Sequence, residues 1–324
     1  MAPQRNKKFQ FSGHETFTLR QNWPYKMVAY CNDALSQGKF ADFNDAYAVV
    51  PLGVGKNMVS SMKWWGLQCG FLENTEEGIV PTLFSNLVFG CNQSGPSQDL
   101  FTLLDGEPLD LYGESKVTAW VAHWNLCSAP NKFTCAWYLF NVYNDQFVTR
   151  DVLQKKVMEF AKSNGVSVTA NTVKRDVEVL FRSYCPVVSK KDSSEDTVDN
   201  LFADLNLITL KGTSGFDISR SFKTSLPTPL FVWAVIDHWE TLNKISASQT
   251  LDWFDIAFAP SSPGRVFKLN ESDLSSRLEE FEKLTDGKII WTDQLGIRNL
   301  ICRTKDSNEL RELKERMLVK AFRG

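Results

Sequence analysis

Residues 51–73 read PLGVGKNMVSSMKWWGLQCGFLE, and in this segment two closely spaced glycines, Gly53 and Gly55, precede an amphipathic stretch. A helix is expected from Lys56 onward, because apolar side chains recur there at helical spacing, at Met58, Met62, Trp65 and Cys69. The following residues 71–84, FLENTEEGIVPTLF, predict a strand, a turn and a second strand. A glycine turn, a helix with one polar face and a hairpin are typical of a winged helix-turn-helix module.

The polar face of this helix carries Lys56, Asn57, Ser60 and Lys63, which we expect to bind DNA. A glycine-rich turn that enters a helix presents free N–H groups and the positive end of the helix dipole, and both suit a phosphate. The turn does not match a nucleotide-binding P-loop, because Asn57 follows the lysine where Ser or Thr is required and the upstream glycine is missing. The alternative is a helix pair used only for protein packing.

Residues 147–185 predict a second module of the same kind. A helix at 147–165 begins at a Thr149 cap, and the next helix, within 166–185, begins at Thr169 or Asn171. The apolar face of the second helix is formed by Val173, Val177, Leu180 and Tyr184. The side chains expected near a DNA backbone are Lys174, Arg175 and Arg182. Residues 205–219 then predict a small hairpin.

A third helix-plus-hairpin unit is expected near the C-terminus. Residues 270–287 predict a helix that stops at Gly287, and residues 288–303 alternate around a turn as in a β-hairpin. The amphipathic residues 307–322 predict a last helix, for packing or for a homodimer contact.

These patterns predict a mainly α protein with small β-wings, an α+β chain built from several winged helix-turn-helix modules. At 324 residues, two or three modules are expected. The predicted division is 1–115, with the N-terminal motif and the first module; 116–224, a helical core with the second; and 225–324, with the third.

The bulk properties exclude several classes of protein. A net charge of −2 excludes a globally basic nucleic-acid coat protein but leaves room for local basic patches. No run of about 18 apolar residues predicts a membrane span, and the N-terminus has no apolar signal segment. The seven cysteines are scattered and none has zinc-ligand spacing, which indicates free thiols in the cytoplasm.

The sequence around two of the three histidines indicates different roles for them. His123 lies among tryptophans and is interpreted as a core residue, whereas His14 belongs to the segment FSGHETFTLR at residues 11–20. That segment lacks the second histidine of a zinc-protease motif. His14, Glu15 and Arg20 could instead serve a phosphodiester site: His as proton shuttle, Glu as orienting group or ligand of a Mg or Mn ion, and Arg as stabiliser of the phosphate charge. The alternative is an ion pair between Glu15 and Arg20 that fixes the segment.

Four ordered segments carry a family resemblance: FSGHETFTLRQNW, LGVGKNMVSSMKWWG, AWVAHWNLCSAP and TVKRDVEVLFRSY. Together they resemble a bacterial family of unknown function encoded beside DNA phosphorothioation genes. This family supplies the B component, a DNA-nicking protein, of single-strand (Ssp) systems. The match runs from about residue 9 to 210 and more weakly to 305. The residues that fall within the matching motifs are His14, Glu15, Arg20, Gly53, Gly55, Lys56, Asn57, Lys174, Arg175 and Arg182.

The resemblance implies DNA binding in an anti-phage defence system that replaces a backbone oxygen with sulfur. Its implied partners are a cysteine desulfurase and an ATP-dependent sulfurtransferase-like protein, and no organic cofactor is expected. Nicking of one DNA strand would allow sulfur incorporation. The alternatives are a non-catalytic adaptor that recruits the sulfur-transfer proteins and a winged-helix transcription regulator.

Overall fold

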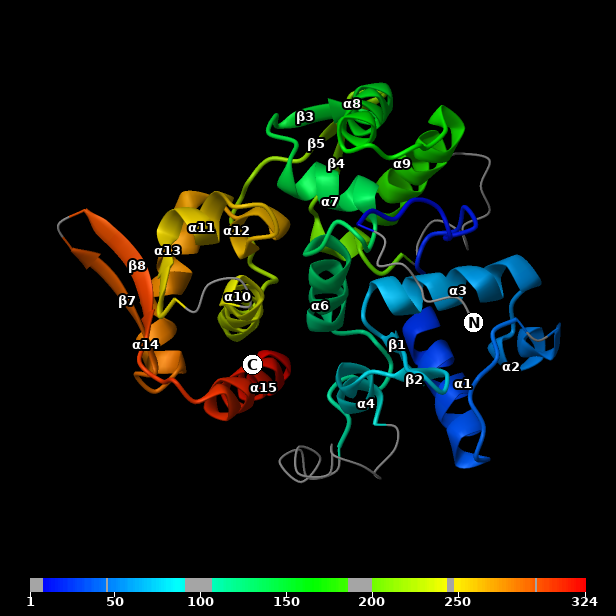
Figure 1. The fold of residues 1–324 in the computed structure, drawn as a ribbon, viewed down its shortest axis with the longest axis horizontal. Coiled ribbons are helices and arrows are strands. Elements are labelled where there is room, and N and C mark those ends of the chain that lie inside the picture. Colours follow the sequence, from blue (N-terminus) through cyan, green and yellow to red (C-terminus); the bar gives the residue numbers. More distant parts are fainter. Residues whose placement is uncertain (1–7, 45, 91–106, 186–199, 244–247, 295) are drawn as a thin grey trace. The chain divides into compact units, whose positions relative to one another are not determined.

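The computed structural model describes residues 8–44, 46–90, 107–185, 200–243, 248–294 and 296–324 (Figure 1). Its contacts divide the chain into two compact units. The first unit comprises residues 1–138 and 147–217, and the second comprises residues 139–146 and 218–324. The first two predicted modules therefore share one unit, and the third falls within the other. Within the described residues no helix is both long and apolar enough to cross a bilayer.

The first unit begins with helices around a short hairpin. Its elements are α1 (Trp23–Ser36), a 3-10 turn η1 (Ala46–Ala48), α2 (Val49–Leu52), α3 (Lys56–Gln68), β1 (Leu72–Asn74), β2 (Ile79–Pro81) and α4 (Leu83–Phe89). Gly53 adopts a left-handed conformation (φ 64°) that ends α2, and Gly55 caps α3. Strands β1 and β2 pair antiparallel, Leu72 opposite Pro81. The helix and hairpin predicted from residues 51–84 are thus confirmed.

The rest of the first unit combines a helical core with a three-stranded sheet. Its elements are α6 (Lys116–Cys127), α7 (Thr134–Asn141, which ends in the second unit), β3 (Phe147–Thr149), α8 (Arg150–Ser163), α9 (Ala170–Tyr184), η2 (Ala203–Leu205), β4 (Thr209–Lys211) and β5 (Gly215–Asp217). The sheet is antiparallel with strand order β3-β5-β4, and α8 and α9 lie beside it (Figure 1).

Side-chain caps explain where α8 and α9 begin. The Thr149 hydroxyl accepts a hydrogen bond from Val152 N–H at the start of α8, and Thr169 accepts one from Thr172 N–H at the start of α9. Each cap satisfies a backbone donor that the first helical turn leaves unpaired. Thr149 is confirmed as a cap, and the choice left open between Thr169 and Asn171 is decided for Thr169.

Aromatic rings fill the core of the first unit. Tyr184 of α9 stacks on Phe202 with ring centroids 4.9 Å apart, and Phe181 stacks on Phe216 of β5 at 4.0 Å. The fully buried His123 hydrogen-bonds through Nδ1 to the Tyr184 hydroxyl at 2.6 Å. His123 is confirmed as a core residue, and the bond joins α6 to α9.

The second unit has its own helices and sheet. Its elements are α10 (Thr228–Asn243), β6 (Thr250–Asp252), α11 (Trp253–Phe258), α12 (Pro263–Val266), α13 (Glu271–Glu279), α14 (Phe281–Leu284), β7 (Ile289–Gln294), β8 (Ile297–Cys302) and α15 (Ser307–Arg323). The sheet is antiparallel with strand order β6-β8-β7. The predicted hairpin at 288–303 is confirmed as β7 and β8.

The helix predicted at 270–287 is two helices, α13 and α14. They are separated at Glu280, whose N–H bonds the Arg277 carbonyl, one residue short of α-helical spacing. The terminal α15 packs on α10, where Lys314 Nζ lies 2.5 Å from Asp237 Oδ1 and 2.7 Å from Glu240 Oε2. Packing is thus one role of α15, and the homodimer contact stays a prediction.

The fold class is confirmed as mainly helical α+β with small antiparallel sheets. The six described cysteines are free, and Cys91 lies outside the described residues.

Candidate functional site

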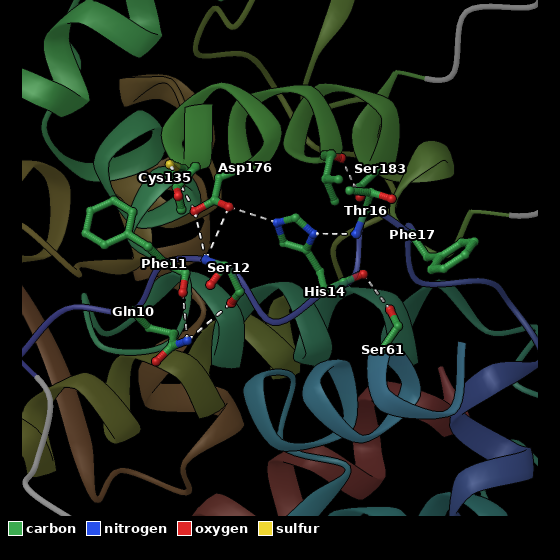
Figure 2. A network of polar contacts seen from close by, with 12 residues as sticks. Gln10, Phe11, Ser12, His14, Thr16, Phe17, Ser61, Cys135, Asp176 and Ser183 are labelled. Atoms are coloured by element: carbon green, nitrogen blue, oxygen red, sulfur yellow. Dashed lines mark hydrogen bonds and ion pairs between the residues drawn. The ribbon is translucent and has the colours of Figure 1, made fainter. Parts of the chain in front are cut away.

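The N-terminal motif is held in the first unit by one buried contact. His14 Nε2 lies 3.0 Å from Asp176 Oδ1 of α9, and the two side chains are 3% and 0% exposed (Figure 2). The Asp176 carboxylate also accepts hydrogen bonds from Ser12 N–H, at 3.2 Å and 3.1 Å to its two oxygens. Cys135 Sγ approaches Oδ2 at 3.9 Å. A buried carboxylate needs such donors, because an unpaired one would be strongly destabilising.

The second ring nitrogen of His14 is occupied as well. The N–H of Thr16 donates to Nδ1 at 3.1 Å (Figure 2). An acceptor at Nδ1 leaves the ring proton on Nε2, where it points at Asp176. His14 therefore bridges its own loop and α9. The ring packs edge-on against Trp64, at 5.4 Å between centroids, and against Phe133, at 5.7 Å.

Helix α3 fixes the other side of the loop. The buried Ser61 hydroxyl donates to the His14 carbonyl at 2.8 Å, and Phe17 N–H donates to the same carbonyl at 2.8 Å. Trp65 Nε1 donates to the Phe17 carbonyl at 3.0 Å. The loop thus lies between α3 and α9, both of which carry residues expected to contact DNA.

The loop backbone is unusual. Ser12, Glu15 and Thr16 have φ values of 58°, 46° and 65°, in the region that residues other than glycine seldom adopt. Gly13 has φ 106°, and a Cβ there would lie 2.3 Å from Trp64 Cδ1. Glycine is therefore required at position 13 for space as well as for conformation.

Arg182 of α9 ties down the same loop. Its Nη2 donates to the Thr16 carbonyl at 2.5 Å, and its own carbonyl accepts from Asn200 Nδ2 at 3.0 Å. Residue 200 also pairs with Arg20 in an isolated antiparallel bridge. Arg182 was predicted to contact DNA. Its side chain is exposed, but one of its N–H donors is already used in the hydrogen bond to the motif.

The three predicted catalytic residues face different surroundings. His14 is 2% exposed, Glu15 is exposed, and Arg20 is half-buried with its guanidinium 5.9 Å from the Trp23 ring centre. Proton transfer by His14 would require residues 12–16 to open. The catalytic assignment stays a prediction, with Glu15 as its solvent-facing member.

The predicted DNA-binding residues mostly face solvent. Lys56, Asn57 and Ser60 are exposed on α3, with Lys63 half-buried beside them. Lys174 and Arg175 are exposed on α9, and the predicted apolar face of that helix, Val173, Val177, Leu180 and Tyr184, is buried.

Asp176 and Ser61 were not anticipated as site residues. Asp176 lies three positions after Val173 on the apolar stripe of α9, and a charged residue on a buried helical face needs a partner. That placement is the signal in the sequence, but it does not identify His14 as the partner. Ser61 is likewise a polar residue on the buried face of α3. Its position in the sequence is less informative, because serine is often exposed.

The residue types around the motif limit metal chemistry. Within the described ranges no group of three or more His, Cys, Asp or Glu side chains is arranged to hold a metal ion. Burial, followed by the neighbouring Asp176, raises the pKa of Cys135, so this thiol is a poor ligand or nucleophile. Glu15 is the one exposed carboxylate of the motif.

The geometry defines a mainly helical α+β protein whose N-terminal motif is locked between two helices. The chain belongs to the family described as protein of unknown function DUF4007, whose model matches residues 11–321. This confirms the resemblance drawn from the four sequence segments.

Two solved structures share the fold. One, titled SspB crystal structure, has a TM-score of 0.75 and 20% identity, covering 97% of this chain and 89% of that chain. The other, titled magnesium ion-bound SspB crystal structure, has a TM-score of 0.72 and 19% identity, covering 96% and 97%. No curated protein matches the chain significantly.

Proposed function

We propose that this chain is a DNA-binding component of a bacterial DNA phosphorothioation system. The observation that carries the proposal is the element order β3, α8, α9, β4, β5 with sheet order β3-β5-β4. This is the order of a winged helix domain, with α9 as the recognition helix and the β4–β5 turn as the wing. The family and the SspB fold support the assignment to phosphorothioation.

The charge distribution on α9 supports DNA contact. Lys174 and Arg175 are exposed in the first half of the helix, the part that recognition helices direct at bases and phosphates. Lys211 is exposed at the end of β4, next to the turn of the wing. A chain with a net charge of −2 binds DNA through such local patches, since phosphate contacts dominate affinity.

Helix α3 offers a second contact. Gly55 N-caps it without a side-chain hydrogen bond, and Lys56 and Asn57 are exposed in its first turn. Free N–H groups and a lysine at a helix N-terminus suit a backbone phosphate. The hairpin β1–β2 follows α3 directly, as a wing would.

Salt-dependent DNA binding tests this proposal. Replacing Lys174 and Arg175 together by alanine should weaken binding to a duplex oligonucleotide and lower the slope of log K against log salt by about 1.8, roughly 0.9 per phosphate contact. Fluorescence anisotropy at several salt concentrations measures both. Lys320→Ala, at an exposed lysine of α15, is the control. An unchanged affinity and slope in the double variant would refute α9 as the DNA-contacting helix.

Strand nicking is a finer proposal for the same chain. It is supported by the family resemblance and by the exposed Glu15 in a loop braced by Arg182. Here His14, bonded at both ring nitrogens, positions the loop, and Glu15 faces the substrate. The proposed partners are the cysteine desulfurase and the sulfurtransferase-like protein. The adaptor alternative predicts DNA binding without nicking, and the regulator alternative predicts a sharp sequence preference.

A further inference from the structure

Four cationic side chains gather in the second unit. Arg220 and Lys223 come from the segment before α10, Arg265 from α12, and Lys268 from the turn that follows α12. Lys223 and Lys268 are only 6% and 4% exposed, and the two arginines are half-buried. Such deep burial is rare for a lysine side chain.

Backbone contacts hold the two segments together. Ser221 N–H donates to the Lys268 carbonyl at 3.0 Å, and residues 221 and 269 form an isolated parallel bridge. Lys223 Nζ donates to the Ser221 hydroxyl at 2.8 Å. The cluster is therefore built by the fold and does not depend on chance orientations of surface side chains.

The arginines are fixed by neutral groups. Arg220 Nη1 donates to the carbonyls of Ala257, at 3.1 Å, and Leu269, at 3.3 Å, and its guanidinium lies 4.8 Å from the Phe258 ring centre. Arg265 Nε donates to the Phe258 carbonyl at 2.9 Å, and Nη1 to Asn144 Oδ1 at 2.6 Å. These contacts orient both positive charges without neutralising them.

Three of the four cations, Arg220, Arg265 and Lys268, are not balanced by a carboxylate among the described residues. Within the part of the chain that the structure describes, no ion pair joins Arg220, Arg265 or Lys268 to a carboxylate, and no protein group accepts a hydrogen bond from the Lys268 ammonium. The nearby Asp273 is paired with Arg277 at 2.8 Å and accepts Lys223 N–H. Glu271 acts electrostatically on Arg220 but is not among the causes that shift the pKa of Arg265 or Lys268.

The surroundings of Lys268 lower the pKa of its ammonium group. Burial, then the charges of Arg220, Arg265 and Lys223, lower the pKa of Lys268 to about 7. Burial and Arg265 also lower the pKa of Arg220, to about 10. Such a cluster of like charges is unfavourable by itself, and a bound anion would relieve the repulsion between them.

We propose that Lys268, Arg220 and Arg265 form a phosphate-binding site in the second unit. Arginine and lysine together supply the donors and the charge that a tetrahedral oxyanion takes, in a partly dry environment that strengthens each contact. The phosphate belongs either to a small molecule or to a DNA backbone. The site goes beyond the α9 interface and does not depend on it.

Lys268→Met is the diagnostic variant, because methionine keeps the length of the side chain and removes its charge. The full chain is studied in phosphate-free buffer at pH 6.5, with inorganic sulfate as the probe and chloride at matched ionic strength. Millimolar sulfate should raise the melting temperature of the wild type by roughly 2–4 °C. Lys268→Met should melt at the same or a higher temperature without sulfate and lose the sulfate response. Lys283→Met, at an exposed lysine of α14, should keep it.

Two results would contradict the proposed phosphate-binding site. One is a wild type that responds to sulfate no more than to chloride. The other is a Lys268→Met variant that keeps the full response or melts lower without sulfate, since the charge would then be stabilised by the protein itself. If these results support the site, titration with a duplex oligonucleotide identifies the source of the phosphate. At least tenfold weaker DNA binding by Lys268→Met would assign the phosphate to DNA. Unchanged DNA binding would assign it to a small phosphate compound. The variant in which Lys174 and Arg175 are both alanine should keep its sulfate response. The sulfate response therefore tests the phosphate site, and the DNA affinity of that variant tests the α9 interface.

Discussion

Asp176 of α9 binds the imidazole of His14 at 3.0 Å, across 162 residues of sequence, and both side chains are buried. The pair therefore joins the N-terminal motif to the helix proposed to contact DNA. Any change in this pair acts on both.

Replacing Asp176 by alanine should lower the free energy of unfolding by roughly 2–5 kcal/mol, because it removes the acceptor of the buried His14 Nε2–H and of the partly buried Ser12 N–H. Urea denaturation measures the loss. Asp176→Asn is the matched control and should cost less, since its oxygen can keep the place of Oδ1 while its NH2 group faces Cys135 Sγ. If both variants lose the same free energy of unfolding, the hydrogen bonds to residue 176 do not account for the stabilisation.

Gly13→Ala should destabilise the first unit by roughly 2–5 kcal/mol, which combines an unfavourable φ with overpacking against Trp64. Gly165→Ala is the control, because Gly165 also has a positive φ, of 70°, but open space around its Cβ position. It should lose only about 1–2 kcal/mol. If the two variants unfold at the same urea concentration, the close approach of Trp64 has no energetic consequence.

Glu15→Gln should leave stability unchanged, since Glu15 is exposed, and should slow plasmid nicking by about 10²-fold or more. Conversion of supercoiled to open-circular plasmid, with and without Mg²⁺ or Mn²⁺, measures the rate. His14→Ala should lose both nicking and stability, because it removes the bridge to α9. Wild-type nicking by Glu15→Gln would remove Glu15 from the reaction, and no nicking by the wild type would favour the adaptor.

His238 should make the second unit sensitive to acid. Burial lowers the pKa of His238 to about 4, against the opposing effect of Asp237, and its Nε2 is buried without a hydrogen-bond partner among the described residues. Between pH 6.5 and 4 the unfolded chain binds a proton that the folded chain does not, so stability falls as the pH falls. His238→Leu should reduce this loss by roughly 2.4 kcal/mol, as measured by urea denaturation at pH 7 and pH 4.5. An identical pH dependence in the variant would exclude His238 as a cause.

Much of the fold could be predicted because local patterns determine it. The faces of α3 and α9, the Thr149 cap and the 288–303 hairpin all follow from spacing of apolar residues and turn chemistry. The short helices α11 and α12 and the strand β6 were not predicted, since elements of three to six residues carry too few periods to be recognised.

The candidate site was less accessible to prediction, because its central contact is long-range. His14 has the residue type of a catalytic group, and only its partner, Asp176, shows that it is buried and fully bonded. The four segments that carry the family resemblance meet here: the loop bonds Ser61 and Asp176, and His123 bonds Tyr184. Part of that resemblance therefore reflects the framework of the first unit, in addition to any chemistry.

The distance in sequence between His14 and Asp176 also has a consequence for synthesis of the chain. The loop of residues 12–16 leaves the ribosome before α9, and its acceptor on α9 and the Arg182 donor to Thr16 are made more than 160 residues later. Since long-range contacts cannot stabilise a chain that lacks one partner, the loop cannot dock until α9 has been translated. The motif at residues 11–20 is thus among the last parts of the first unit to reach its native position.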